Sequence, residues 1–261
     1  NIHQVMFGLS FQKLYSMQWP FKILVKYASR GRKKRFFDGL DNIFELAEFP
    51  DRLLVLISLD TDDPEMCNDE VKEKLSTYKN IHVCWGLSDN KIHACNKDFD
   101  KIPENFKDWA IVCNFSDDQR WTAYGWDTMI RVDFNNVSPD FSHYMAYLDP
   151  DTHGALSTLF ICGRKFYNVF GFIYDEQFFS LFCDNLAEDV AKHLGKYHYT
   201  GYQIYQHFNP SYGYERFEPD QLYIDQQKIG WDLDQKLYYK IIGEGVEKYL
   251  ERFDIKSLRK E

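Results

Sequence analysis

The residues in this 261-residue chain best suited to chemistry are Ser116-Asp117-Asp118, which directly follow an apolar run at 111–115. Two adjacent carboxylates at the end of a buried strand repel each other unless a cation or strong hydrogen-bond donors lie beside them. Carboxylate oxygens on a loop suit Mg²⁺ or Mn²⁺, which also bind substrate phosphates. The tripeptide is therefore a candidate metal site, and the alternative is an N-cap for the following segment.

A basic cluster in a protein of net charge −9 indicates a second kind of site. Residues 30–35 contain Arg30, Arg32 and three more cations at the predicted start of a helix. Cations there oppose the helix dipole, so an anion such as a diphosphate, bound between the side chains and the free amides, explains them better. The alternative is a solvated helix start without a ligand.

A third polar position is Asp60, at the end of the apolar run 53–59. A carboxylate at this place can accept hydrogen bonds from a base or ribose, although it can also be purely structural. We interpret Asp62 and Asp63 as capping residues, with Pro64 at the first position of a helix that runs to about Tyr78.

Alternating strands and helices position these residues. Apolar runs and helical spacing predict strands at 21–27, 53–59, 81–85 and 109–115, with helices after the first three. This order predicts an α/β fold with a mostly parallel central sheet flanked by helices. Because ligands bind beyond the carboxyl ends of parallel strands, we expect the three polar groups at one edge of the sheet.

The second half is less regular. We predict strands at 143–148 and 157–162, a helix at 178–194, a strand or loop at 199–207, a polar linker at 209–228 and an amphipathic helix at 233–253. We expect residues 1–215 to form the catalytic domain and residues 216–261 a helical extension packed on it.

Composition excludes several classes of protein. The chain has 31 Lys and Arg against 40 Asp and Glu, so general nucleic-acid binding is not expected. No apolar run approaches the ~20 residues that span a bilayer, which predicts no transmembrane segment and leaves peripheral membrane contact open. Six cysteines without a CxxC pair, and no secretion signal, predict a cytoplasmic protein.

In their order and spacing, these motifs resemble a GT-A glycosyltransferase, close to family 2. The similarity covers roughly residues 20 to 210. It includes, beyond the strand ends above, the segments Asn90–Asn96, Gly125-Trp126-Asp127, Gly163–Tyr167 and Cys183-Asp184-Asn185. The resemblance implies a Rossmann-like GT-A sheet, an acceptor side in the second half and a C-terminal helix.

The resemblance also assigns roles to residues. It implies a donor site made by Ser29, Arg30, Arg32, Asp60, Lys91, Asn96 and Asp117. It places Mn²⁺ or Mg²⁺ on Asp118, with His207 completing the metal site. It makes Asp184 or Glu188, which share one helix face, the base that deprotonates the acceptor. The alternatives are ordinary exposed acids for these two and a structural role for His207.

Two departures from the family pattern limit the function. The family's Asp-x-Asp appears here as Ser116-Asp117-Asp118, and the Gln-x-x-Arg-Trp motif of processive members is missing. The resemblance implies a metal-dependent, inverting enzyme in polysaccharide biosynthesis, and the missing motif predicts single addition. It would move a sugar from a UDP- or GDP-sugar to the hydroxyl of a saccharide or lipid-linked acceptor.

Two alternatives remain. One is a non-catalytic domain that binds a nucleotide-sugar. The other is a sugar nucleotidyltransferase, which usually has a Gly-rich phosphate loop, whereas residues 29–35 contain one glycine.

Overall fold

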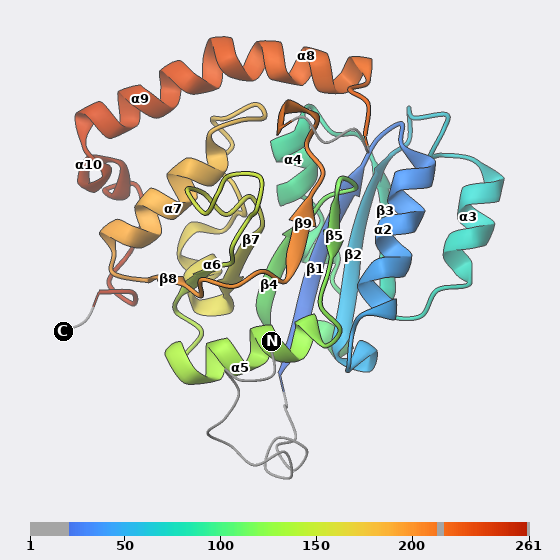
Figure 1. The fold of residues 1–261 in the computed structure, drawn as a ribbon, viewed down its shortest axis with the longest axis horizontal. Coiled ribbons are helices and arrows are strands. Elements are labelled where there is room, and N and C mark those ends of the chain that lie inside the picture. The colour runs from blue at the N-terminus through green and yellow to red at the C-terminus, as the bar shows by residue number, and fades with distance from the viewer. Residues whose placement is uncertain (1–20, 213–216, 260–261) are drawn as a thin grey trace.

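The computed structural model describes residues 21–212 and 217–259. Its core is a seven-stranded sheet in the order β3-β2-β1-β4-β7-β6-β8 (Figure 1). The first four strands along the chain are β1 (Lys22–Ser29), β2 (Leu53–Asp60), β3 (Ile81–Gly86) and β4 (Trp109–Phe115). The others are β6 (Tyr144–Ala146), β7 (Phe160–Gly163) and β8 (Tyr197–Tyr199). The predicted boundary at 215–216 lies outside the described residues.

The pairing confirms the expected mostly parallel sheet. Strand β1 pairs in parallel with both β2 and β4, and β2 pairs in parallel with β3. Strand β7 runs antiparallel to β4 and β6, while β6 and β8 are parallel. The carboxyl ends of β1, β2, β3 and β4 therefore meet at one edge.

Helices cover both faces of the sheet, because side chains alternate along each strand. One face packs against α2 (Lys33–Glu45), α3 (Asp69–Ser76) and α5 (Trp126–Val137). The other packs against α4 (Lys91–Asn96), α6 (Arg164–Phe170) and α7 (Cys183–His193). Thus Ile23 and Val25 of β1 lie in the first core and Leu24 in the second, each fully buried.

The helix after β2 begins later than predicted. Helix α3 starts at Asp69 and is capped by Asn68, whose side chain accepts from the Val71 amide. Pro64 lies before the helix, in a turn where the Asp63 carboxylate accepts from the amides of residues 65 and 66. Asp63 therefore caps a turn. The prediction that Pro64 takes the first position of the helix is wrong.

The C-terminal part differs most from the prediction. The last part of the expected linker is helical. Helix α8 (Gln221–Ile229) begins at the N-cap Asp220 and continues through a π-helical turn, η6 (Gly230–Asp234), into α9 (Gln235–Glu244). The expected single helix at 233–253 breaks at Gly245, where φ is +97°, and resumes as α10 (Val246–Leu250).

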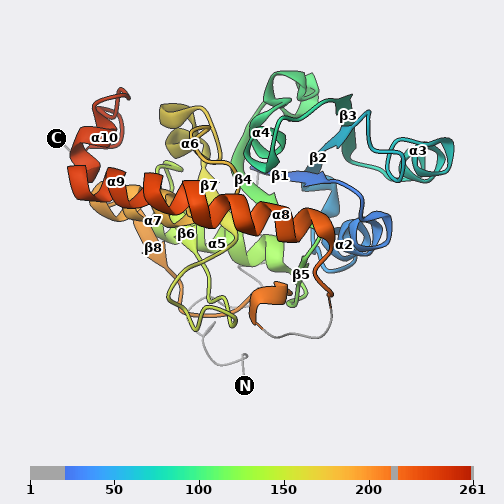
Figure 2. The same ribbon diagram turned by 90° about the horizontal axis from the view of Figure 1, so that it is seen from above.

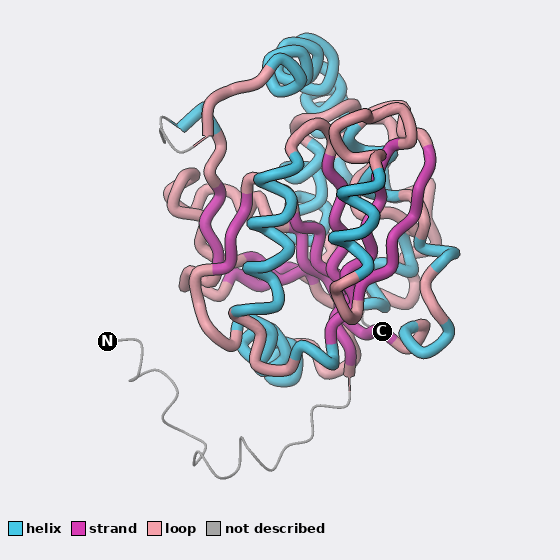
Figure 3. The backbone as a smooth tube through the Cα atoms, turned by 90° about the vertical axis from the view of Figure 1, so that its right-hand side faces the viewer, coloured by secondary structure: helices cyan, strands magenta, loops and turns pink. Residues whose placement is uncertain are grey.

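The rod made by α8, η6 and α9 crosses the molecule at the carboxyl end of the parallel strands (Figures 1 and 2). Viewed from the side, α8 stands beyond the strand ends, joined to the body by the segment that follows β9 (Tyr205–His207) (Figure 3). In residues 21–212 and 217–259, no helix is both long enough and apolar enough to cross a bilayer.

Candidate active site

The strand ends converge as the sequence predicts. The Arg30 guanidinium donates to Asp60 at 2.9 Å, which joins the ends of β1 and β2. The Ser29 hydroxyl donates to Asp117 at 2.5 Å, which joins the ends of β1 and β4. Arg32 also donates to Asp117, at 3.1 Å. These contacts bring together five of the candidate donor-binding residues, namely Ser29, Arg30, Arg32, Asp60 and Asp117.

Carboxylates of the chain itself neutralise the basic loop. The amides at the start of α2, which we expected to receive a ligand anion, donate to side chains of the turn after β2. Gly31 donates to Asp63 at 2.7 Å, and Lys33 donates to Glu65 at 2.9 Å. These acids take the place expected for a ligand anion at the two amides, so a diphosphate would have to bind mainly through the arginine side chains.

Arg32 joins the loop to the C-terminal helices. Its guanidinium donates to both oxygens of Asp220, at 2.6 and 2.9 Å, in a bidentate pair. The neighbouring Arg35 donates to the Glu218 carbonyl and lies over the Phe217 ring, 4.4 Å from its centroid. The segment that precedes α8 is therefore held directly over the predicted diphosphate site.

Asp118 and His207 form the second part of the site. Strand β5 (Gln119–Trp121) begins directly after Asp118 and pairs with β9, where Gln119 lies opposite His207. The Phe208 amide donates to the Asp118 carbonyl at 2.7 Å. This pairing sets the His207 Nε2 atom 3.3 Å from Asp118 Oδ2.

The two adjacent acids have opposite electrostatic surroundings. Burial raises the pKa of Asp117, and the Asp118 charge adds to this, so that Arg32 does not restore the ordinary value. Burial also acts to raise the pKa of Asp118, but His207, Ser116 and Lys91 outweigh it and hold that pKa well below its usual range. Asp118 is therefore the acid that stays ionised and suits a cation.

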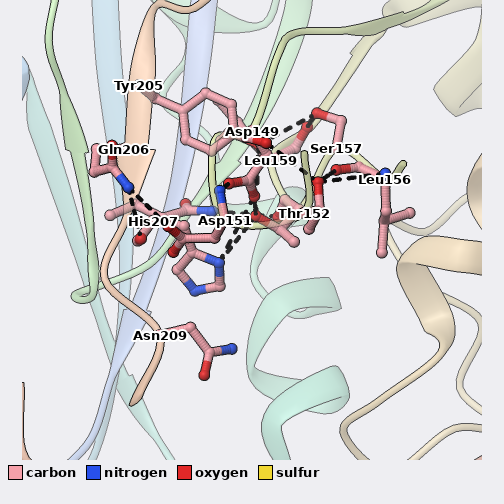
Figure 4. A network of polar contacts seen from close by, with 12 residues as sticks. Asp149, Asp151, Thr152, Leu156, Ser157, Leu159, Tyr205, Gln206, His207 and Asn209 are labelled. Atoms are coloured by element: carbon pink, nitrogen blue, oxygen red, sulfur yellow. Dashed lines mark hydrogen bonds and ion pairs between the residues drawn. The ribbon is translucent and has the colours of Figure 1, made fainter. Parts of the chain in front are cut away.

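A buried polar network holds His207 from behind (Figure 4). The Nδ1 atom lies 3.0 Å from the Thr158 hydroxyl, which in turn donates to Asp149. The Tyr205 hydroxyl donates to the same Asp149 oxygen at 3.2 Å, and Asp149 is fully buried. The ring of His207 is thus contacted at both nitrogens.

Asp184 lies in the same electrostatic environment. It is in the first turn of α7, and burial raises its pKa, which Lys91 and His207 lower only in part. Desolvation lowers the pKa of Lys91, but nearby groups including Asp118 and Asp184 outweigh it and raise the value. Electrostatic interactions thus couple Lys91, Asp118, Asp184 and His207, which come from four separate segments.

Glu188 and Asn96 have other contacts. Glu188 is 1% exposed, accepts from the Ser157 amide at 2.8 Å and pairs with Lys192 at 2.8 Å. The Asn96 amide donates to the Tyr174 carbonyl at 2.7 Å, and its oxygen accepts from the amides of residues 173 and 174. Both side chains form hydrogen bonds with backbone groups. We therefore include neither Asn96 in the proposed donor site nor Glu188 as the proposed base.

The donor set fits a divalent cation that also binds phosphate. Among the described residues, no three His, Cys, Asp or Glu side chains group closely enough to hold an ion alone. Mg²⁺ usually takes one or two protein ligands plus substrate phosphates and waters, at about 2.0–2.1 Å. Donor atoms 3.3 Å apart, as in Asp118 and His207, are spaced like neighbouring ligands of one such ion.

Several residues of the site have no clear signal in the sequence. Asp220 falls in the segment predicted to be a linker, and Thr158 lies in a predicted strand without a motif around it. Lys97 and Ser88 both contact Asp60, at 3.5 and 2.6 Å. Asp149 does have a signal in the sequence. It follows the predicted strand 143–148, as Asp60 follows the predicted strand 53–59.

No protein-family model matches the sequence, and no curated protein matches it. Solved structures do match. Mannosyltransferase PcManGT from Pyrobaculum calidifontis, in complex with GDP-Man and Mn²⁺, has a TM-score of 0.56 and 15% identity, covering 78% of this chain and 64% of that chain. S. aureus TarS 1-349, in complex with UDP-GlcNAc, has a TM-score of 0.57 and 11% identity, covering 88% and 73%.

A longer S. aureus TarS structure matches with a TM-score of 0.54, and the match covers 88% of this chain but 44% of that one. This chain therefore spans less than two thirds of the length of PcManGT and of the longer TarS. The chain has the GT-A fold of these glycosyltransferases.

Proposed function

We propose that this chain is a metal-dependent, inverting glycosyltransferase that moves a sugar from a nucleoside-diphosphate donor to a hydroxyl acceptor. The observation that carries the proposal is the Asp118–His207 pair, 3.3 Å apart, at the edge of the sheet that also holds the arginine loop. Asp184 is coupled to this pair electrostatically, through His207 and Lys91. The GT-A fold supports it, because neighbours with that fold were solved with GDP-Man and Mn²⁺ or with UDP-GlcNAc.

Arg30 and Arg32 would bind the donor diphosphate. Both guanidinium groups now pair with carboxylates, and a diphosphate offers oxygens of the same kind with more charge. Donor binding would therefore displace one of these carboxylates. We expect this to be Asp220, because it belongs to the start of α8 and not to the ends of the strands. Asp60, 7% exposed, would accept a hydrogen bond from the base or ribose.

Asp118 and His207 would hold the Mn²⁺ or Mg²⁺ ion. When bound, such an ion stabilises the negative charge that develops on the departing nucleoside diphosphate. Lys91, whose charge is favoured by Asp118 and Asp184, would add positive charge on the same side. Ser29 and Asp117 would keep the loop after β1 in place against the end of β4.

Asp184 would be the general base. Its carboxylate takes the acceptor hydroxyl proton as the hydroxyl oxygen forms a bond to the anomeric carbon. The bond from that carbon to the diphosphate oxygen breaks, and the nucleoside diphosphate leaves with the electron pair. One displacement of this kind inverts the anomeric carbon. Burial raises the pKa of Asp184 towards neutrality, which strengthens it as a base.

We also propose a saccharide or lipid-linked saccharide as acceptor and the cytoplasm as compartment. All six cysteines are free thiols, which suits a reducing compartment. The C-terminal helices would form an extension of the catalytic domain, since Tyr249 and Leu250 of α10 lie in the same core as α7.

The decisive experiment is calorimetry of UDP and GDP binding with and without Mn²⁺, on wild type and Asp118→Asn. We expect Mn²⁺ to strengthen nucleotide binding to the wild type and to have little effect on the variant. Asp38→Asn is the control, because Asp38 is exposed on α2 and pairs only with Lys34 among the ion pairs described. Equal Mn²⁺ enhancement in wild type and Asp118→Asn would overturn the metal assignment.

Incubation with UDP-glucose or GDP-mannose and Mn²⁺ separates the functional classes. Slow release of free sugar supports a transferase. Donor binding with neither hydrolysis nor transfer to any tested saccharide would point to a non-catalytic binding domain. Exchange of pyrophosphate into the donor would instead identify a nucleotidyltransferase.

A further inference from the structure

Asp149 and Thr158 form a second polar pair, on the Nδ1 side of the His207 ring, and the mechanism above gives them no role. Asp149 and Thr158 come from the two ends of the loop between β6 and β7, and neither is among the predicted site residues. Asp149 is fully buried, and its Oδ1 atom accepts from the Asp151 amide at 3.0 Å. Its Oδ2 atom accepts from Tyr205 at 3.2 Å and from Thr158.

The direction of each hydrogen bond follows from the number of protons available. The Thr158 hydroxyl has a single proton, and the acceptor-only carboxylate of Asp149 receives it. The hydroxyl oxygen, 3.0 Å from His207 Nδ1, then has only lone pairs to offer. The Nδ1 atom must therefore carry hydrogen and donate it to Thr158, so the ring is held at Nδ1.

The opposite ring atom faces the candidate metal ligand. With Nδ1 bound to Thr158, Nε2 lies 3.3 Å from Asp118 Oδ2. A histidine ligand is oriented by the group that accepts a hydrogen bond from its far nitrogen, and loss of that group typically costs about 10–100-fold in metal affinity. Asp149, Thr158 and His207 have this arrangement, and the His207 side chain is only 11% exposed.

We propose that Thr158, fixed by Asp149, is a positioning residue that holds His207 through Nδ1 and directs Nε2 to the cation beside Asp118. The metal part of this inference rests on the proposed function. The orientation part does not, because it concerns hydrogen bonds that exist without a ligand.

The first test measures Mn²⁺-dependent nucleoside-diphosphate binding by calorimetry in Thr158→Val, Thr158→Ser and Thr152→Val. Thr158→Val keeps the shape and loses the hydroxyl, and we expect Mn²⁺ affinity to fall about 10–100-fold. Thr158→Ser restores the hydroxyl and should recover most of it. Thr152→Val is the matched control, because Thr152 lies on the same loop and bonds the carbonyls of Asp149 and Leu156.

An equal loss in Thr152→Val and Thr158→Val, or no rescue by Thr158→Ser, would overturn the positioning role. Melting temperatures of all three variants identify any loss that comes from unfolding. Asp149→Asn should weaken Mn²⁺ binding in the same direction, since the amide can also donate and so no longer fixes the Thr158 proton.

The second test needs no metal. Nitrogen-15 NMR of the histidine ring in the metal-free protein should show a hydrogen-bonded Nδ1–H for His207 in wild type and Thr158→Ser. The signal should be lost or exchange rapidly in Thr158→Val. Its absence from the wild type would refute the orientation. Its presence in a wild type that binds no Mn²⁺ would leave the orientation standing and refute the proposed metal site.

Discussion

The two sides of the Asp117–Asp118 pair handle charge differently. On the side of Asp117, Arg30 and Arg32 meet carboxylates in direct ion pairs of 2.6 to 3.1 Å. On the side of Asp118, Lys91 and Asp184 influence each other's pKa, yet no direct ion pair joins them within the described residues. On the first side the protein's own carboxylates neutralise both arginines, whereas on the second side Lys91 and Asp184 interact without a direct ion pair between them.

This difference has a consequence for binding and for rate. A ligand on the arginine side must compete with an internal carboxylate, so changes there should alter affinity by modest factors. A group on the Asp184 side would take part in proton transfer in the transition state, so its removal should lower the rate by a large factor. The variants below test this contrast, beginning with the largest effect.

The largest effect is expected for Asp184→Asn. The amide keeps size and polarity but cannot take the acceptor proton, so turnover should fall by about 10²- to 10⁴-fold while donor affinity is retained. Steady-state kinetics with calorimetry of donor binding measures both. Glu188→Gln is the comparison on the same helix. We expect this variant to have a lower melting temperature but a turnover close to that of the wild type. A large rate loss in Glu188→Gln with near-normal Asp184→Asn would move the base to Glu188.

A smaller effect is expected for Asp220→Asn. Asparagine is also a good N-cap, so α8 should keep its start while the bidentate charge on Arg32 is lost. A partly exposed ion pair is worth about 0.2–1 kcal/mol, so nucleoside-diphosphate affinity should rise by up to roughly fivefold. Titration with UDP and with uridine checks this, because uridine lacks phosphate and should bind unchanged. Weaker UDP binding would show that Asp220 supports the donor site.

The smallest effect is a pH shift in Lys91→Gln. The base must be ionised, so turnover falls as pH drops through the pKa of Asp184. Lys91 lowers that pKa, and its removal should move the acid limb of the turnover profile to higher pH. Turnover at saturating donor across pH measures the shift. Lys192→Gln, which removes a charge beside Glu188, should leave the limb in place, and a shift towards lower pH would contradict the assignment.

The regular half of the fold was predictable because two local rules describe it. Continuous apolar runs marked β1, β2, β3 and β4, and the polar residues after them lie at one edge, as parallel strands require. Asp60 and Asp117 could therefore be proposed from position alone. Their partners in the other half could not, since no periodic pattern places Asp220 next to Arg32.

Errors occurred where side chains bind distant backbone. Pro64 suggested a helix start, but Asp63 is committed to the Gly31 amide and its own turn, so α3 begins at Asp69. The polarity of residues 209–228 predicts a linker, whereas α8 begins within this stretch and is stabilised at its start by Asp220. Sequence spacing indicates which residues share a helix face, and it is silent on which backbone amides they bind.

Asp234, in the π-helical turn, links the C-terminal rod to the helix that carries Asp184. Its buried carboxylate accepts from the amides of Phe179, Ser180 and Leu181, at 2.7 to 2.8 Å, just before α7 begins. These three amides should exchange their hydrogens with solvent slowly while α8 and α9 are docked, and quickly when the rod lifts. Their exchange rates would therefore report whether the rod stays docked in a donor or acceptor complex.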